Sequence, residues 1–212
     1  MFDLKCGKFC GSMDNNCYLI TDKKTGKSAL IDCSDDSEEM LSFVEGCELE
    51  YILLTHGHCD HIGGSKAVKE KTGAKLAISE DDAYMLTSAK GSLALFMGYP
   101  QNDVAADFYF RDEDVIRLGE TEIKVLATPG HTDGCVCFLC GDCLFTGDTL
   151  FHLSLGRTDF PTGNPAKMSA SLKKLYALEG DYKVYPGHGS FSTLETEKNE
   201  NADFLIIMKY YS

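Results

Sequence analysis

The chain has 212 residues, of which 43% are hydrophobic, and a formal net charge of −13 at pH 7. This length is sufficient to bury a hydrophobic core without disulfides or other covalent staples, and it suits one domain over residues 1–212. A surface this acidic repels phosphate backbones and anionic lipid headgroups, so nucleic acids and membrane surfaces are disfavoured as partners.

The N-terminal segment has no basic start, no apolar run of signal length and no small-residue cleavage site. No window of the chain approaches the roughly 18 apolar residues that a membrane-spanning helix needs. We therefore expect a cytoplasmic protein. In that reducing compartment the ten cysteines are expected to be free thiols, metal ligands or catalytic groups rather than disulfides.

Short apolar runs between turn residues predict four strands in the first half of the chain, at 15–21, 27–33, 50–55 and 75–79. Amphipathic stretches predict a helix near 36–47, a second over 62–72, and a third that begins after Ser79 as its capping residue. Acidic residues at the start of the first predicted helix are stabilised by the positive end of its dipole, which supports this assignment. Residues 88–110 are apolar without a clean period, and we interpret them as a lid or groove wall.

The second half predicts four more strands, at 114–119, 121–128, 135–140 and 143–148. Gly141 and Asp142 form a two-residue hairpin turn between the last two. An amphipathic helix, a short strand with a turn, and a helical tail follow at 165–178, 183–188 and 194–207. The tail leads into the aromatic residues Tyr210 and Tyr211. Because strands followed by helices occur in both halves, the pattern predicts two stacked sheets with helices outside them.

Histidines and carboxylates gather where the predicted strands end. Residues 55–61 read Thr-His-Gly-His-Cys-Asp-His, directly after a buried strand. Pro-Gly-His triplets follow two later strands, and a Gly-Asp pair ends another. Strand ends meet at one edge of a layered α/β fold, and zinc and similar divalent ions take His and Asp ligands. The seven candidate metal ligands are His56, His58, Asp60, His61, His131, Asp148 and His188.

The pattern T-H-x-H-x-D-H, then Pro-Gly-His, Gly-Asp and a second Pro-Gly-His, resembles the metallo-β-lactamase superfamily over nearly the whole chain. Members share a four-layer αββα sandwich with a two-metal site at the edge between the sheets. The resemblance implies that one metal is held by His56, His58 and His131. It implies that a second is held by Asp60, His61 and His188, and that Asp148 bridges the two.

Within the superfamily, the segments TPGHTDGCVCFLCGDCLFTGDTLF, GRTDFP and VYPGHG resemble short glyoxalase II-like members. This resemblance implies cleavage of a small hydroxyacyl thioester by a metal-bridging hydroxide, with Asp60 as the catalytic residue that orients it. It implies two divalent metal ions, zinc in the first place, with iron or manganese also able to occupy such ligands. The chain ends soon after His188, without the helical domain that binds glutathione in longer members, so the use of glutathione stays open.

Two other functions remain open. A persulfide dioxygenase would use a single iron held by two histidines and one aspartate, drawn from His56 or His131 with Asp148. A non-catalytic zinc- or thiol-binding protein is suggested by the ten cysteines. A secreted lactamase is disfavoured because no signal peptide is seen, and RNA processing is disfavoured by the net charge. An electron-transfer di-iron oxidase would carry Glu at position 58, where this chain has His58.

The remaining candidates concern substrate and thiols. Arg157 is a candidate substrate contact or a structural partner of Asp159. Four residues are candidates for groove lining or for lid packing: Tyr99, Phe96, Met97 and Phe108. Cys59, between two candidate ligands, is either a silent neighbour or a thiol that reaches a metal. His152 is interpreted as a loop residue. Four cysteines near the hairpin turn are interpreted as apolar fillers or facing thiols: Cys135, Cys137, Cys140 and Cys143. The oligomeric state stays open.

Overall fold

A computed structural model describes residues 1–10 and 14–210 of the chain. The first sheet contains β1 (Phe2–Phe9), β2 (Asn15–Asp22), β3 (Lys27–Ile31), β4 (Glu48–Leu53), β5 (Lys75–Ser79) and β6 (Phe108–Phe110). Its strands lie in chain order. The pairs β1–β2 and β2–β3 are antiparallel, and the pairs from β3 to β6 are parallel. The strands predicted in this half are confirmed, with small differences at their ends.

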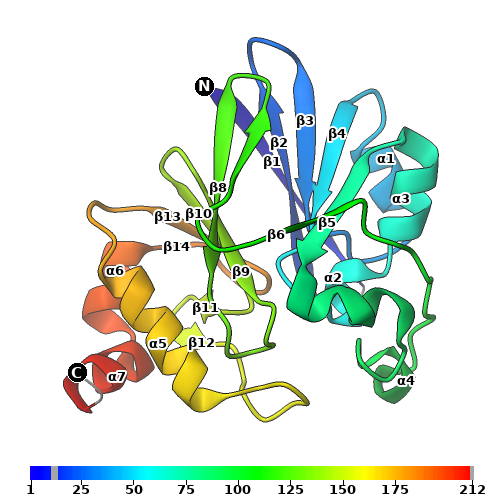
Figure 1. Cartoon of the computed structure of the whole chain (residues 1–212). Helices are drawn as coiled ribbons and strands as arrows, with labels where there is room; N and C mark the ends of the chain where they lie inside the picture. Colours follow the sequence, from blue (N-terminus) through cyan, green and yellow to red (C-terminus); the bar gives the residue numbers. More distant parts are fainter. Residues whose placement is uncertain (11–13, 211–212) are drawn as a thin grey trace.

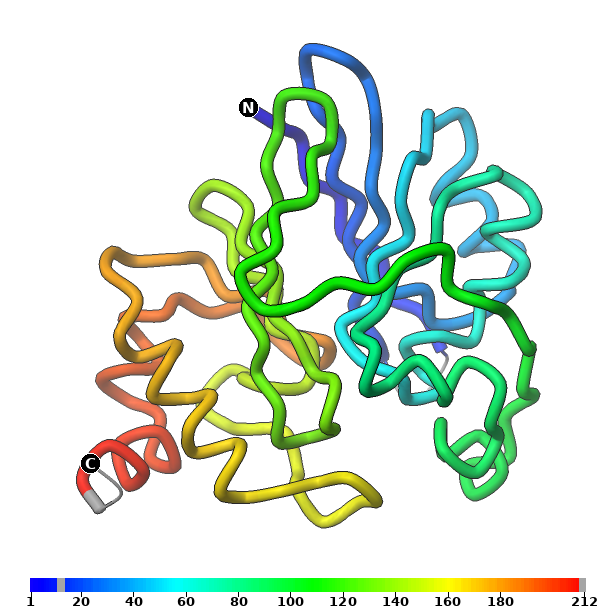
Figure 2. The backbone as a smooth tube through the Cα atoms, viewed as in Figure 1, coloured from blue at the N-terminus to red at the C-terminus, as the bar shows by residue number. Residues whose placement is uncertain are grey.

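The second sheet contains β7 (Val115–Leu118), β8 (Thr121–Ala127), β9 (Val136–Cys140), β10 (Cys143–Gly147), β13 (Lys183–Pro186) and β14 (Ser192–Thr193). Its order is β14-β13-β10-β9-β8-β7, and only the β10–β13 pair in it is parallel. A separate small hairpin joins β11 (Leu150–Phe151) to β12 (Ser154–Leu155). Figure 2 shows the green segment after β6 crossing from the first sheet to the second.

Helices cover the outer faces of both sheets, as Figure 1 shows. The helices are α1 (Glu38–Phe43), α2 (Cys59–Ile62), α3 (Ser65–Thr72), α4 (Ala94–Met97), α5 (Pro165–Tyr176), α6 (Leu194–Glu200) and α7 (Ala202–Tyr210). A 3-10 helix, η2, spans Glu80–Thr87. The model therefore has the four-layer αββα arrangement that the resemblance implied. No helix in the described part of the chain is long and apolar enough to cross a membrane.

Three hydrophobic clusters fill the spaces between the four layers. One packs α1 and α3 against the first sheet, through residues such as Met40 and Val68. The central cluster joins the two sheets and contains Tyr18 and Phe138. The third packs α5 and α7 against the second sheet, with Leu172 among its members. Alternate residues of β2 pack into different clusters, Leu19 into the first and Tyr18 and Ile20 into the central one, so a slip of one residue would exchange two buried sets that are packed differently.

Several elements differ from the predictions. β1 was not predicted, because it is an edge strand whose residues are mostly half-buried or exposed and carry only a weak hydrophobic signal. The segment 88–110 contains α4 and the three-residue strand β6. Ser79 is the N-cap residue of the next helix, as predicted, but that helix is 3-10 and the Ser79 side chain makes no capping hydrogen bond. Tyr211 lies outside the described residues.

Candidate metal centre

The loop after β4 carries His56 and His58, the following helix α2 carries Asp60 and His61, and both are held by the end of β3. Asp32, which follows β3, accepts hydrogen bonds from the backbone N–H and the hydroxyl of Thr55, both at 2.8 Å. It also accepts a hydrogen bond from Nδ1 of His61 at 2.8 Å. That bond fixes the tautomer and leaves Nε2 of His61 to face the other ligands. Sequence reasoning missed Asp32, although a carboxylate at a strand end is the signal that identified Asp148.

Three imidazoles form the first ligand cluster. Nε2 of His56 lies 3.2 Å from Nδ1 of His58, which lies 2.9 Å from Nε2 of His131. All three side chains are buried. Nδ1 of His131 donates to the backbone carbonyl of Arg157 at 2.7 Å, so Nε2 is the ring nitrogen that can face a metal ion. Three ring nitrogens therefore converge on one point.

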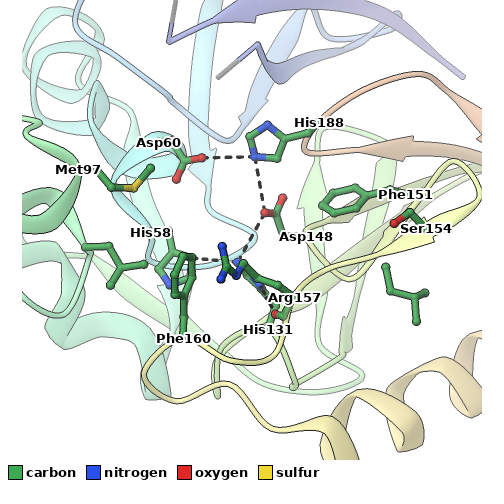
Figure 3. A pocket seen from close by; sticks show the side chains of 12 residues that line it. His58, Asp60, Met97, His131, Asp148, Phe151, Ser154, Arg157, Phe160 and His188 are labelled. Carbon is green, nitrogen blue, oxygen red and sulfur yellow. Dashed lines mark hydrogen bonds and ion pairs between the residues drawn. The ribbon is translucent and has the colours of Figure 1, made fainter. Parts of the chain in front are cut away.

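The second ligand cluster adjoins the first (Figure 3). Nε2 of His188 lies 3.3 Å from Oδ2 of Asp60, and Nε2 of His61 lies 3.7 Å from the same oxygen. Asp148 lies between the clusters. Its Oδ1 is 3.3 Å from Nε2 of His61, and its Oδ2 is 3.5 Å from Nε2 of both His131 and His188. The structure thus brings together all seven predicted ligands.

The donor set fits divalent metal ions. Ligand atoms lie within 4.8 Å of one another in three groups: His56, His58 and His131; His56, His61 and Asp148; and Asp60, His61 and His188. Within the described residues, Oδ1 of Asp148 is buried and accepts no hydrogen bond. Buried carboxylates without hydrogen-bond donors are costly unless a cation compensates them. Five imidazoles and two carboxylates can therefore hold two borderline divalent ions.

The electrostatics of the site keep four of the ligands in metal-binding forms: His56, His58, Asp60 and Asp148. Burial, reinforced by His131, lowers the pKa of His58 to about 3. Burial also lowers the pKa of His56 well below its usual range, so both rings are neutral. Burial opposes ionisation of Asp148, but the neighbouring His61 and His131 hold the pKa of its carboxyl well below the usual range. Asp60 behaves in the same way, with its pKa lowered by His61 against the effect of burial.

Zinc affinity of the metal-free protein is expected to fall as the pH is lowered. Burial opposes protonation of His61, but the carboxylates of Asp148, Asp60 and Asp32 raise its pKa well above the usual value. Zinc must therefore displace a proton from His61 at any pH below that raised pKa. Below that raised pKa, each displaced proton weakens zinc binding by about tenfold per pH unit. Competition titrations against a chromogenic chelator at pH 6, 7 and 8 measure this, and a constant affinity across that range would contradict it.

Glycine is required in both Pro-Gly-His triplets because the backbone passes close to its neighbours. A Cβ at Gly187 would lie 2.4 Å from Oδ1 of Asp148 and 2.7 Å from Cε1 of His61. Gly130 has a φ of 150°, and a Cβ there would lie 2.5 Å from Cα of Met168 on α5. Any larger residue would push a ligand-bearing loop away from the centre.

A buried carboxylate on η2 ties two ligand loops together. Asp82 is fully buried and accepts hydrogen bonds from the backbone N–H of Gly57 and of Gly134, both at 2.9 Å. It also accepts from the hydroxyl of Thr132 at 2.6 Å. Gly57 separates two ligands of the first cluster, and Thr132 follows the third. Sequence reasoning missed Asp82, because nothing in the run of three acidic residues at 80–82 distinguishes the one that turns inward.

A cavity of about 470 Å³ opens beside the two clusters and is bounded in part by Asp60, Asp148 and His188. Arg157, a predicted substrate contact, lines it. Of the four predicted groove residues, Met97 lines the cavity, whereas Phe108 and the 68% exposed Phe96 do not. Tyr99 lines a separate cavity of about 80 Å³ next to Cys59. The predicted lid segment also contributes Leu93 to the wall of the main cavity, which no periodicity indicated.

The cysteines are free thiols and lie outside the ligand groups. All ten are unpaired, and none belongs to a potential metal-binding group in the described part of the chain. Cys59 contacts Met97 through sulfur atoms 3.7 Å apart, and burial raises the pKa of its thiol to about 12. Cys140 and Cys143 face each other across the hairpin turn, as predicted. His152 lies between β11 and β12 and pairs with Glu197, 3.5 Å away.

Comparison with known proteins agrees with this geometry. The family model of the metallo-beta-lactamase superfamily matches residues 11–188. The hydroxyacylglutathione hydrolase GloC of Haemophilus influenzae is 33% identical over 198 residues, which cover 90% of this chain and 92% of that protein. The crystal structure of the B3 metallo-beta-lactamase BLEG-1 superposes with a TM-score of 0.88 at 28% identity, covering 95% of this chain and 99% of that one. TTHA1623, solved in a di-iron-bound form, gives 0.83 at 30% identity, covering 94% and 99%.

Proposed function

This chain belongs to the metallo-beta-lactamase superfamily, and we propose that it is a glyoxalase II-like hydrolase of small hydroxyacyl thioesters with two divalent metal ions. One observation carries the proposal: two ligand clusters share Asp148 beside a cavity large enough for a small acyl thioester. The 33% identity with a hydroxyacylglutathione hydrolase supports the choice of a thioester. The free thiols suit a reducing compartment, and we propose that the enzyme is cytoplasmic.

The proposal assigns the ligands to two ions. His56, His58 and His131 would hold one, and Asp60, His61 and His188 would hold the other, with Asp148 between them. When bound, the two cations supply Lewis acidity toward a carbonyl oxygen and lower the pKa of a coordinated water.

The protein's own residues orient and shield the reacting groups. Asp60 lines the cavity and stays ionised because His61 lowers its pKa against burial, so its carboxylate can accept a hydrogen bond from the attacking water. In the net reaction the water oxygen bonds to the carbonyl carbon and the carbon–sulfur bond breaks. One water proton passes to the departing thiolate, and the other is released when the acid ionises. A thiolate leaves readily, so a general acid is not required.

Turnover of two lactoyl thioesters tests this function. S-lactoylglutathione and the neutral S-lactoyl-N-acetylcysteamine are offered to protein stripped of metal and then reloaded with zinc, iron or manganese. We expect metal-restored hydrolysis of at least one thioester, and the ranking of metals tests our assignment of zinc. Replacing Asp60 with alanine is expected to lower kcat by about a hundredfold or more, because it removes both a ligand and the water-orienting group. Unchanged turnover in this variant, or none with any metal in the parent, would contradict the proposal.

A single-iron persulfide dioxygenase is the second candidate. His56, His61 and Asp148 form a group of two histidines and one aspartate, which is the ligand set such an enzyme needs. Oxygen uptake by the iron-loaded protein with glutathione persulfide tests it. The hydrolase is favoured because the group of Asp60, His61 and His188 has no role in a single-iron site. A non-catalytic thiol-based metal store is disfavoured, because the described ligand groups contain no cysteine.

A further inference from the structure

The cavity beside the ligand clusters is largely apolar away from the metal ligands. Five apolar side chains line it: Leu93, Met97, Phe151, Leu155 and Phe160. They come from two separate segments of the chain, one around α4 and one that runs from β11 through the loop after β12. Figure 3 shows Met97 and Phe151 on opposite sides of the opening. A substrate that reaches the ligands must therefore pass between apolar walls.

Arg157 is the one lysine or arginine among the described residues that line this cavity. The backbone carbonyl of Arg157 accepts the hydrogen bond from Nδ1 of His131. This contact holds the backbone of Arg157 next to the ligand cluster. Its guanidinium is already engaged. Nε donates to Oδ1 of Asp159 at 2.7 Å, and a terminal nitrogen donates to Oδ2 at 2.8 Å. The guanidinium carbon lies 3.8 Å from the centre of the Phe160 ring.

This pairing occupies the one lysine or arginine side chain of the described cavity wall. A bidentate carboxylate occupies the donor fork that a carboxylate on a substrate would otherwise use. Asp159 also places a negative charge near the opening, which repels an anionic ligand. An apolar wall offers no compensation to a carboxylate that loses its water.

From this arrangement we infer that the substrate is a thioester of a neutral, apolar thiol in preference to glutathione, and that Asp159 sets this preference by occupying Arg157. The inference rests on the proposed thioester hydrolysis and names its substrate class. Glutathione carries two carboxylates, and the one arginine of the described cavity wall is already paired with Asp159. A neutral thiol has no carboxylate and therefore needs no cationic partner in the cavity.

Binding of two thioethers tests the inference without requiring turnover. S-butylglutathione and the neutral S-butyl-N-acetylcysteamine are titrated into the zinc-loaded protein by calorimetry. We expect the neutral thioether to bind with about a tenfold lower Kd, because the cost of an unpaired buried charge falls on glutathione alone. Asp159→Asn releases Arg157 and is expected to lower the Kd of S-butylglutathione by about threefold to fivefold, which is the usual worth of an exposed ion pair. The Kd of the neutral thioether should not change.

Two further variants serve as controls. Asp142→Asn removes the same charge from an exposed pair with Lys183, 2.9 Å apart, and should change neither Kd. Adding Arg157→Gln to Asp159→Asn should abolish the gain for S-butylglutathione. Tighter binding of S-butylglutathione than of the neutral thioether by the parent, or an unchanged Kd in Asp159→Asn, would overturn the inference. If the expected binding pattern appears while neither lactoyl thioester is hydrolysed, the preference of the cavity for a neutral ligand is confirmed. The proposed thioesterase function is then contradicted.

Discussion

Replacing Asp148 with asparagine is expected to reduce thioester hydrolysis by about a thousandfold or more and to lower the bound metal from two ions to one or none. Both carboxylate oxygens of Asp148 face ring nitrogens: Oδ1 lies 3.3 Å from His61, and Oδ2 lies 3.5 Å from His131 and from His188. An amide keeps the shape but loses the negative charge, and it turns an N–H₂ donor toward atoms that must bind a cation. Because this one side chain serves both clusters, its loss affects both ions.

Metal content by plasma mass spectrometry, measured alongside turnover, checks this prediction. Asp142→Asn is a matched control, because Asp142 precedes β10 and Asp148 follows it, so the same exchange is made at the two ends of one strand. Asp142 is exposed and pairs with Lys183, and its replacement should leave metal content and turnover unchanged. An Asp148→Asn protein that still held two ions and turned over at the parental rate would show that the clusters do not share this carboxylate.

The seven ligand candidates could be predicted because their chemistry is visible in residue type and their positions follow strand ends. Strand β4 is short and ends in the buried apolar residues Ile52 and Leu53, so its end could be found from hydropathy alone, and the ligand loop follows it. Asp32 and Asp82 could not be predicted in the same way. Each acts by accepting hydrogen bonds from residues that lie 23 to 52 positions away in the chain. An aspartate carries no local sign of such distant donors.

The layered fold was predictable for a similar reason, since short apolar runs bounded by turn residues mark most strands. The walls of the cavity were predictable only in part. Leu93 and Met97 lie in a segment whose apolar residues serve the core, the cavity and the surface at once, so no period emerges. Phe96, one position from Met97, has the same hydrophobic character and faces solvent. Only the backbone path through α4 decides which of these neighbours reaches the cavity.

Asp82→Ala is expected to lower the free energy of unfolding by about 3 kcal/mol and to weaken metal binding at the first cluster. The carboxylate accepts three hydrogen bonds, from Gly57, Thr132 and Gly134, and it is fully buried. Alanine would leave two backbone N–H groups without an acceptor in the interior, at about 1–3 kcal/mol for each buried group left unsatisfied. The two loops would then be free to move apart, which separates His131 from His56 and His58 and raises the entropic cost of binding an ion.

Denaturant unfolding of the metal-free protein isolates the stability effect, and zinc titration of the same variant measures the effect on the site. Asp81→Ala is the control, because Asp81 is the preceding residue on η2 and is exposed, so its removal should cost less than about 0.5 kcal/mol. Asp82→Asn removes the negative charge but keeps a side chain that can hydrogen-bond to the two loops, so it distinguishes the effect of the charge from that of the hydrogen bonds. An amide can accept on one side only and presents a donor to the other loop, so we expect it to recover part of the stability but not the full zinc affinity. If Asp82→Ala unfolded at the same denaturant concentration as Asp81→Ala and bound zinc equally well, the link between the two loops would have no energetic role.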